Sequence, residues 1–191
     1  MKKILGLTIA FMLFIGMAGI GTWAYFSDTE TSSGNVLVAG TLDLKTGDYD
    51  GVTATLTADN MKPGDTVGPE TITLKNTGSV AGATLDLLFA YIESDSTPNV
   101  VNMSADATAA MIEVTTLNYG GASILGSVFN TNATAWIDIQ DLAAADLSGQ
   151  SGIAASPGTK DFEIGVLLRT ETGNDFQADG INITMTFTLN Q

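Results

Sequence analysis

The side chains that most often carry out catalysis are scarce in this chain. Its 191 residues include no histidine and no cysteine. Histidine is the usual general base near neutral pH, and a helical zinc protease site needs two histidines one turn apart plus a glutamate. Lys75 stands near Ser79 as a local base and hydroxyl pair, but in a turn-like sequence. We therefore predict no catalytic residue and no enzymatic activity.

Carboxylates are the remaining groups that bind metal ions, and calcium suits them well. Asp48-Tyr49-Asp50-Gly51 resembles a fragment of an Asp-rich calcium loop, but Thr46 and Thr57 stand where that loop needs acids. Two further acidic pairs could chelate an ion, Glu93 with Asp95 and Asp175 with Asp179. Solvent-exposed turns explain these acidic patterns better than a calcium site does. We predict no metal centre and no cofactor, with loose calcium binding by acidic loops as the alternative.

Three Asn-X-Ser/Thr triplets are candidate sites for N-linked glycans. They begin at Asn102, Asn132 and Asn182. Triplets this short are common by chance, and their use depends on the host cell. They stand as candidates only.

The chain is strongly acidic, and its charge is unevenly distributed. All 21 acidic residues follow Ala24, and two of the seven basic residues, Lys2 and Lys3, precede it. Such a surface repels nucleic acid and anionic lipid, so we expect neither as a partner. The hydrophobic content of 45% and the regular alternation argue against disorder. Without cysteine, the core and strand pairing must supply the stability.

The first 24 residues are typical of a signal peptide. Two lysines precede the uncharged, mostly apolar stretch 4–20, and Thr22 and Ala24 place small residues before a cut between Ala24 and Tyr25. The stretch also reaches the lower limit of a membrane span, about 17–25 residues, so an uncleaved anchor is the alternative. We predict cleavage after Ala24, secretion, and membrane contact only through an uncleaved segment.

Most of the remaining chain alternates apolar and polar residues with a period of two, which is typical of strands with one buried face. Lys62-Pro63-Gly64-Asp65 predicts a type II turn. In the run 83–92 both faces are apolar, so we predict a central strand covered on both sides for part of its length. The runs that predict strands are 41–45, 52–57, 72–76, 83–92, 113–119, 124–129, 162–169 and 181–190.

Two short helices interrupt the strands. We expect one at 105–112 with Ser104 as N-cap, and one at 138–147 with Asp138 as N-cap. A Gly/Ser/Pro-rich loop is expected at 148–159 and an acidic loop at 170–180. The pattern predicts an all-β fold, an antiparallel jelly-roll-like β-sandwich with one or two short helical insertions. We divide the chain into a signal peptide (1–24), an N-terminal segment (25–40) and a sandwich domain (41–191).

Several segments resemble the TasA/CalY (camelysin) family of secreted biofilm-fibre subunits and its archaeal bundling-pilus relatives. Residues 21–28 are similar to that family's cleavage junction for a SipW-type signal peptidase, and 39–44 to its first core strand. Residues 60–65 with 75–79, and the closing strand 181–191, follow in the same order. The ordered set spans most of the mature chain, whereas 94–159 has no matching motif.

The resemblance implies a structural function. The family's N-terminal strand, once freed by the peptidase, inserts into the next subunit, and this head-to-tail contact builds a filament because it does not close. The implied partners are copies of the chain itself, a SipW-like signal peptidase and other components of an extracellular biofilm matrix. The donor-strand residues that the resemblance assigns are Tyr25, Phe26, Ser27, Asp28, Thr29, Glu30, Val36, Leu37 and Val38.

Two other functions stay open at this point. The chain could act as a monomeric adhesin or binding domain, either secreted or anchored in a membrane. Camelysin-like proteins are sometimes classed as metalloproteases, and a metal-dependent protease is the remote third reading because the usual histidines are absent.

Overall fold

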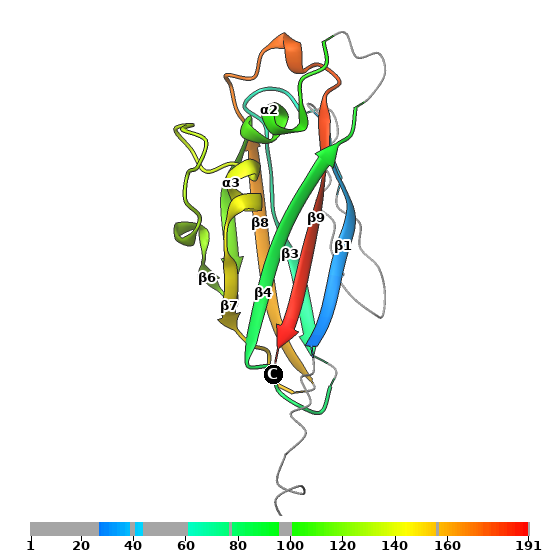
Figure 1. The fold of residues 1–191 in the computed structure, drawn as a ribbon, viewed down its shortest axis with the longest axis vertical. Coiled ribbons are helices and arrows are strands. Elements are labelled where there is room, and N and C mark those ends of the chain that lie inside the picture. The colour runs from blue at the N-terminus through cyan, green and yellow to red at the C-terminus, as the bar shows by residue number, and fades with distance from the viewer. Residues whose placement is uncertain are drawn as a thin grey trace, which may run out of the picture.

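The chain folds as a sandwich of two antiparallel β-sheets (Figure 1). The computed structural model describes backbone and side chains for residues 61–76, 78–95, 101–155 and 157–190, and the backbone alone for 27–38 and 41–43. One sheet has five strands in the order β2-β1-β9-β4-β7, and the other has four in the order β3-β8-β5-β6. Successive long strands from β3 to β9 alternate between the sheets, which is the connectivity of a jelly roll. The predicted all-β sandwich is confirmed.

Both predicted helices, and the predicted strands that correspond to β3, β4, β5, β8 and β9, appear in the predicted order. The strands are β1 (Ser27–Val38), β2 (Thr41–Asp43), β3 (Thr66–Asn76), β4 (Thr84–Glu93), β5 (Ile112–Tyr119), β6 (Ala122–Ser123), β7 (Leu147–Ser151), β8 (Gly158–Leu168) and β9 (Gly180–Asn190). The helices are α2 (Ala105–Ala110) and α3 (Ile139–Ala144), with 3-10 turns η1 (Leu125–Ser127) and η2 (Asn174–Phe176).

Alternation along the strands builds the core between the sheets. On β9 the residues Ile181, Ile183, Met185 and Phe187 are buried, while the threonines between them are only partly so. Phe162 on β8 has no exposed surface, and its ring lies 6.1 Å from that of Phe89 and 5.3 Å from that of Phe187, measured between centroids. These ring contacts join the four-stranded sheet to the five-stranded one.

Local sequence signals placed the turn and both helix starts correctly. Gly64 has a φ of 94°, and the Asp65 N–H donates to the Lys62 carbonyl at 2.9 Å. Only glycine adopts such a φ without strain, so this turn depends on it. Ser104 caps α2, since its hydroxyl accepts from the Ala107 N–H at 3.3 Å. Asp138 caps α3 as predicted.

Three sequence predictions were wrong in detail. The run 124–129 contains the 3-10 turn η1 instead of a strand, and the predicted loop 148–159 contains most of β7. The second apolar face of β4 is not covered: Leu88 is 59% exposed and Ile92 is 66% exposed. Apolar content alone did not distinguish a covered face from a bare one, because no helix or sheet in the described part of the chain crosses over it. The predicted strand at 52–57 lies outside the described residues.

Candidate functional site

The position beside β9 is occupied by most of the residues that the sequence predicted as a donor strand. β1 lies beside β9 (Figure 1), and in the sheet order it stands between β2 and β9. It pairs with β9 antiparallel at ten positions, from Ser27 opposite Asn190 to Val38 opposite Gly180. The register shifts once, between Ser32 and Asn35. The other edge of β9 pairs with β4. In the single chain, β9 is therefore paired on both edges, and β1 belongs to the sheet.

The register of β1 sets polar residues against the buried positions of β9. Glu30 stands opposite Phe187, and Ser32 stands opposite Met185. Directly opposed residues of an antiparallel pair lie on the same face of the sheet. The β1–β9 contact therefore depends mainly on backbone hydrogen bonds over the first half of β1, and gains apolar partners only at its end, where Leu37 stands opposite Ile181.

β2 adds only three residues to this sheet. Its partners are Val36, Leu37 and Val38 of β1, and Thr41 stands directly opposite Val38. Within the described residues, β1 is the only strand that pairs with β2. The place of β2 in the sheet therefore depends on β1.

The predicted donor-strand residues fall into two groups. Ser27, Asp28, Thr29, Glu30, Val36, Leu37 and Val38 all lie on β1. Tyr25 and Phe26, together with Ala24 at the predicted cleavage site, lie outside the described residues. No helix within the described part of the chain is long and apolar enough to cross a membrane, and the predicted signal peptide lies outside that part.

The three candidate glycosylation sites differ in access. Asn102 is exposed and precedes α2. Asn132 is half-buried, and its side-chain nitrogen donates to Asp138 and to Gln140 at 2.8 and 2.7 Å. Asn182 lies on β9, between β1 and β4. Geometry therefore leaves Asn102 as the accessible candidate.

Two buried carboxylates lie together at the start of α3. Asp138 and Asp141 have no exposed surface and cap the start of α3 reciprocally. The oxygens of Asp138 accept from the Asp141 N–H, from Asn132 and from the Thr134 hydroxyl, and those of Asp141 accept from the Asp138 N–H and twice from Thr131. Burial raises the pKa of Asp138, and the hydrogen bonds from Asn132 and Asp141 partly offset that rise.

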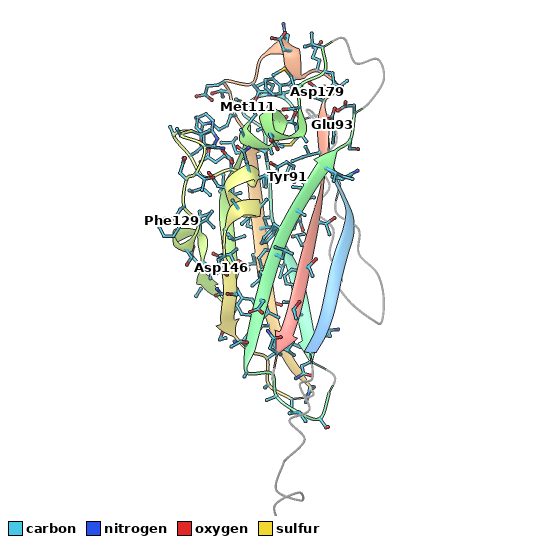
Figure 2. All side chains as sticks on the ribbon, in the orientation of Figure 1. Tyr91, Glu93, Met111, Phe129, Asp146 and Asp179 are labelled. Atoms are coloured by element: carbon cyan, nitrogen blue, oxygen red, sulfur yellow. The ribbon has the colours of Figure 1, made fainter. Side chains whose placement is uncertain are left out.

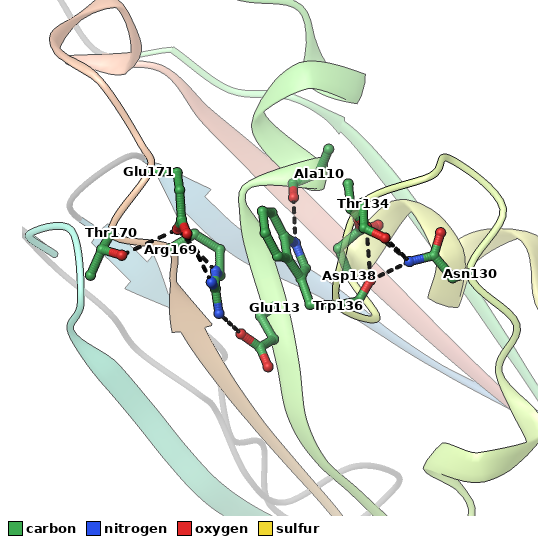
Figure 3. Close-up of polar contacts among 9 residues, drawn as sticks. All are labelled: Ala110, Glu113, Asn130, Thr134, Trp136, Asp138, Arg169, Thr170 and Glu171. Carbon is green, nitrogen blue, oxygen red and sulfur yellow. Dashed lines mark hydrogen bonds and ion pairs between the residues drawn. The ribbon is translucent and has the colours of Figure 1, made fainter.

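A charged cluster lies beside the loop that precedes α3 (Figure 3). The Arg169 guanidinium stacks 4.1 Å from the centroid of the Trp136 ring, and the same group forms ion pairs with Glu113 and Glu171. The Trp136 indole N–H donates to the Ala110 carbonyl at 2.9 Å. The hydrogen bonds that Arg169 donates to Glu171 and Glu113 raise the pKa of Arg169. Sequence reasoning missed this cluster, because its members lie far apart in the chain and share no motif.

Two of the remaining acidic candidates, Asp95 and Asp179, accept backbone hydrogen bonds. Glu93 and Asp179 lie at the end of the sandwich that carries α2 (Figure 2). Asp179 accepts from the Met103 N–H at 3.1 Å, and Asp95 accepts from the Gly180 N–H at 3.4 Å. Asp175 is exposed on η2. Asp48 and Asp50 lie outside the described residues.

The donor groups do not fit a catalytic zinc ion. The whole sequence has neither histidine nor cysteine. Among the described residues, no three acidic side chains gather in a way that could hold a metal ion. The buried pair Asp138 and Asp141 already accepts protein hydrogen bonds on all four carboxylate oxygens. A zinc ion normally needs three protein ligands and an open position, and these residues do not supply them.

A search of curated proteins found no matching relative. The family model described as camelysin metallo-endopeptidase matches residues 1–191, which is the entire sequence. The chain therefore belongs to the camelysin family.

Proposed function

We propose that this protein is a secreted structural subunit that polymerises head to tail into extracellular filaments of a biofilm matrix. In the polymer, residues of β1 from one copy occupy the position beside β9 of the next copy. The observation that carries the proposal is the pairing of Ser27–Val38 with β9 at ten positions, because a segment that completes a sheet in its own chain can complete the same sheet in a second one. Family membership supports it.

The energetics make the exchange sensitive to concentration. Pairing within one chain and pairing between chains form the same β1–β9 hydrogen bonds, so these bonds nearly cancel in the balance. Because β1 is attached to its own domain, it competes with the β1 of another copy at an effective concentration in about the millimolar range. Filaments therefore need concentrated subunits, further contacts between subunits, or capture of β1 before it closes onto its own β9. Cleavage after Ala24 by a SipW-like signal peptidase would release β1 and allow another copy to capture it before it pairs with its own β9. Other matrix components are the expected further partners.

We also propose that the protein is not an enzyme, although its family is described as a metallo-endopeptidase. The support is the donor set: no histidine, no cysteine, and a buried acid pair whose oxygens are already engaged. The non-enzymatic function requires only an exchangeable strand.

A second candidate is a monomeric secreted or membrane-anchored adhesin. One observation favours it: with β1 paired in its own chain, both edges of β9 are satisfied, and the sheet needs no partner there. A disulfide cross-link between β1 and β9 distinguishes the two functions.

Thr29 and Thr188 stand directly opposite each other on β1 and β9. Opposed Cα atoms in an antiparallel pair are about 4.5–5.5 Å apart, which suits a disulfide, and the chain has no cysteine of its own. The variant Thr29→Cys with Thr188→Cys is assembled in reductant, oxidised, and separated on a denaturing gel. Donation predicts a ladder of covalent multimers, whereas a monomeric adhesin gives one internally bridged chain.

The matched control places cysteines at Leu88 and Thr186, which face each other on β4 and β9. Both strands stay within one subunit, so oxidation gives single chains in every case. Filaments seen by electron microscopy that yield no ladder from the Thr29 and Thr188 variant would reject strand donation.

A further inference from the structure

We infer that the exchanged unit is the β1–β2 hairpin, residues 27–43, and that β1 does not move alone. This inference rests on the proposed function and specifies which part of each copy enters its neighbour. It follows from how β2 is held and from how short the connection between the two strands is.

β2 has little reason to stay when β1 leaves. Its three residues pair with Val36, Leu37 and Val38 of β1, and with no other strand in the described part of the chain. Removing β1 would leave the position between β2 and β9 empty. These two strands would then be about 10 Å apart, which is two strand spacings and too far for backbone hydrogen bonds. Three residues without a backbone partner do not hold a strand in a sheet, so β2 remains on β1.

Exchange of β1 alone also conflicts with an open filament. Only Ala39 and Gly40 separate Val38 from Thr41, so these Cα atoms are at most about 11 Å apart. A donated β1 in the same register brings its Val38 to Gly180 of the acceptor. If β2 kept its place in the donor, Thr41 would lie at the donor's own Gly180 end. Both copies would then meet through the same end.

Contact through identical ends produces a closed pair. An open filament needs each copy to use two different surfaces, one for each neighbour. Exchange of β1 alone, with the short connection intact, therefore leads to a reciprocal dimer instead of a chain of subunits.

Exchange of the whole hairpin removes the conflict. The connection between the moving part and the rest of the domain is then 44–60, which joins Asp43 to Met61. Fully extended, a connection of that length spans at most about 60 Å. The eleven-residue strand β9 is only about 36 Å long. A donor can thus lie at either end of the acceptor sheet, and a head-to-tail series becomes possible.

Cysteines at Leu37 and Leu42 test the inference, because these residues stand directly opposite each other on β1 and β2. The variant Leu37→Cys with Leu42→Cys is assembled in reductant and then oxidised. Exchange of the hairpin keeps both thiols in one chain, so the gel shows single chains. Exchange of β1 alone pairs the donor's β1 with the acceptor's β2, so covalent dimers or larger multimers on the gel would overturn the inference.

A second arm oxidises the same variant before assembly. A hairpin that moves as a unit forms filaments with its internal disulfide closed, whereas loss of filaments in the oxidised sample alone would contradict the inference. If that variant does not fold, Val36→Cys with Asp43→Cys replaces it, since those residues are also directly opposed. The Thr29 and Thr188 pair reports separately on strand donation, so its failure and failure of the hairpin inference give different gels.

Discussion

Replacing Phe162 by alanine tests whether the two sheets depend on one aromatic contact. Phe162 projects from β8 with no exposed surface and contacts the rings of Phe89 and Phe187 on the opposite sheet. Phe187 lies on β9, the strand that accepts β1. The substitution therefore removes packing directly beneath the candidate assembly site.

The expected magnitude follows from burial. Truncating a fully buried phenylalanine to alanine costs about 3–5 kcal/mol, which combines lost transfer energy with a residual cavity. The two tilted or edge-on ring contacts place this site in the upper part of that range, because each adds about 0.5–1.5 kcal/mol beyond area burial. A domain with a total stability of about 5–15 kcal/mol would lose a large share of it.

Urea unfolding followed by tryptophan fluorescence measures the change. With a slope of about 2 kcal/mol per molar urea, the midpoint should fall by roughly 2 M at unchanged slope. The matched control is Phe129→Ala, because Phe129 is 78% exposed and its removal should shift the midpoint by less than about 0.25 M. Similar shifts for the two variants would refute the assignment of Phe162 to the contact between the sheets.

Three further predictions concern other parts of the described chain. Asp138→Ala removes the cap of α3 and should cost about 1–2 kcal/mol in urea unfolding, whereas Asp146→Ala at an exposed position should be neutral; equal effects would contradict the role of the cap. Burial raises the pKa of Tyr119 to about 12, so its contribution to stability is complete below the unfolded value near 10 and is lost as pH rises through 12. The free energy of unfolding, measured from pH 9 to 12, should therefore fall less steeply with pH in Tyr119→Phe than in the parent chain. Identical slopes would contradict a raised pKa for Tyr119. In a host that glycosylates Asn-X-Ser/Thr triplets, mass spectrometry should find a glycan on Asn102 and none on Asn132, and a modified Asn132 would show that its hydrogen bonds to Asp138 and Gln140 do not protect it.

Sequence patterns predicted the elements whose causes are local. The Lys62-Pro63-Gly64-Asp65 turn and the capped starts of α2 and α3 all follow from a few neighbouring residues. The alternation of β9 likewise predicts which of its side chains are buried. β7 was missed because a run of Ser, Gly and Gln carries no alternation, and its pairing with β4 depends on contacts distant in sequence.

The two polar clusters, one around Arg169 and one around Asp138, could not be predicted because their contacts depend on the paths that loops and strands take in the fold. Arg169 meets Trp136 and Glu113 only because β8, β5 and the loop before α3 converge. Asp138 was expected to cap a helix, but its burial with Asp141, and the surrounding shell of Thr131, Asn132 and Thr134, depend on the path of that loop. The resemblance predicted that residues of β1 form a donor strand, and the structure pairs β1 with β9 and β2 of its own chain.

The polar composition of β1 is consistent with a strand that changes partners. About ten backbone hydrogen bonds at roughly 1 kcal/mol net each are offset by an ordering cost of about 1–2 kcal/mol per residue. A strand with large apolar residues opposite Met185 and Phe187 would add strong burial and would leave its own β9 slowly. Here Ser32 and Glu30 occupy those register positions, so little apolar burial resists departure. The apolar residues are concentrated at Val36, Leu37 and Val38, where β2 also pairs. That distribution keeps the hairpin together while its hold on β9 stays weak, which is the combination that exchange between subunits requires.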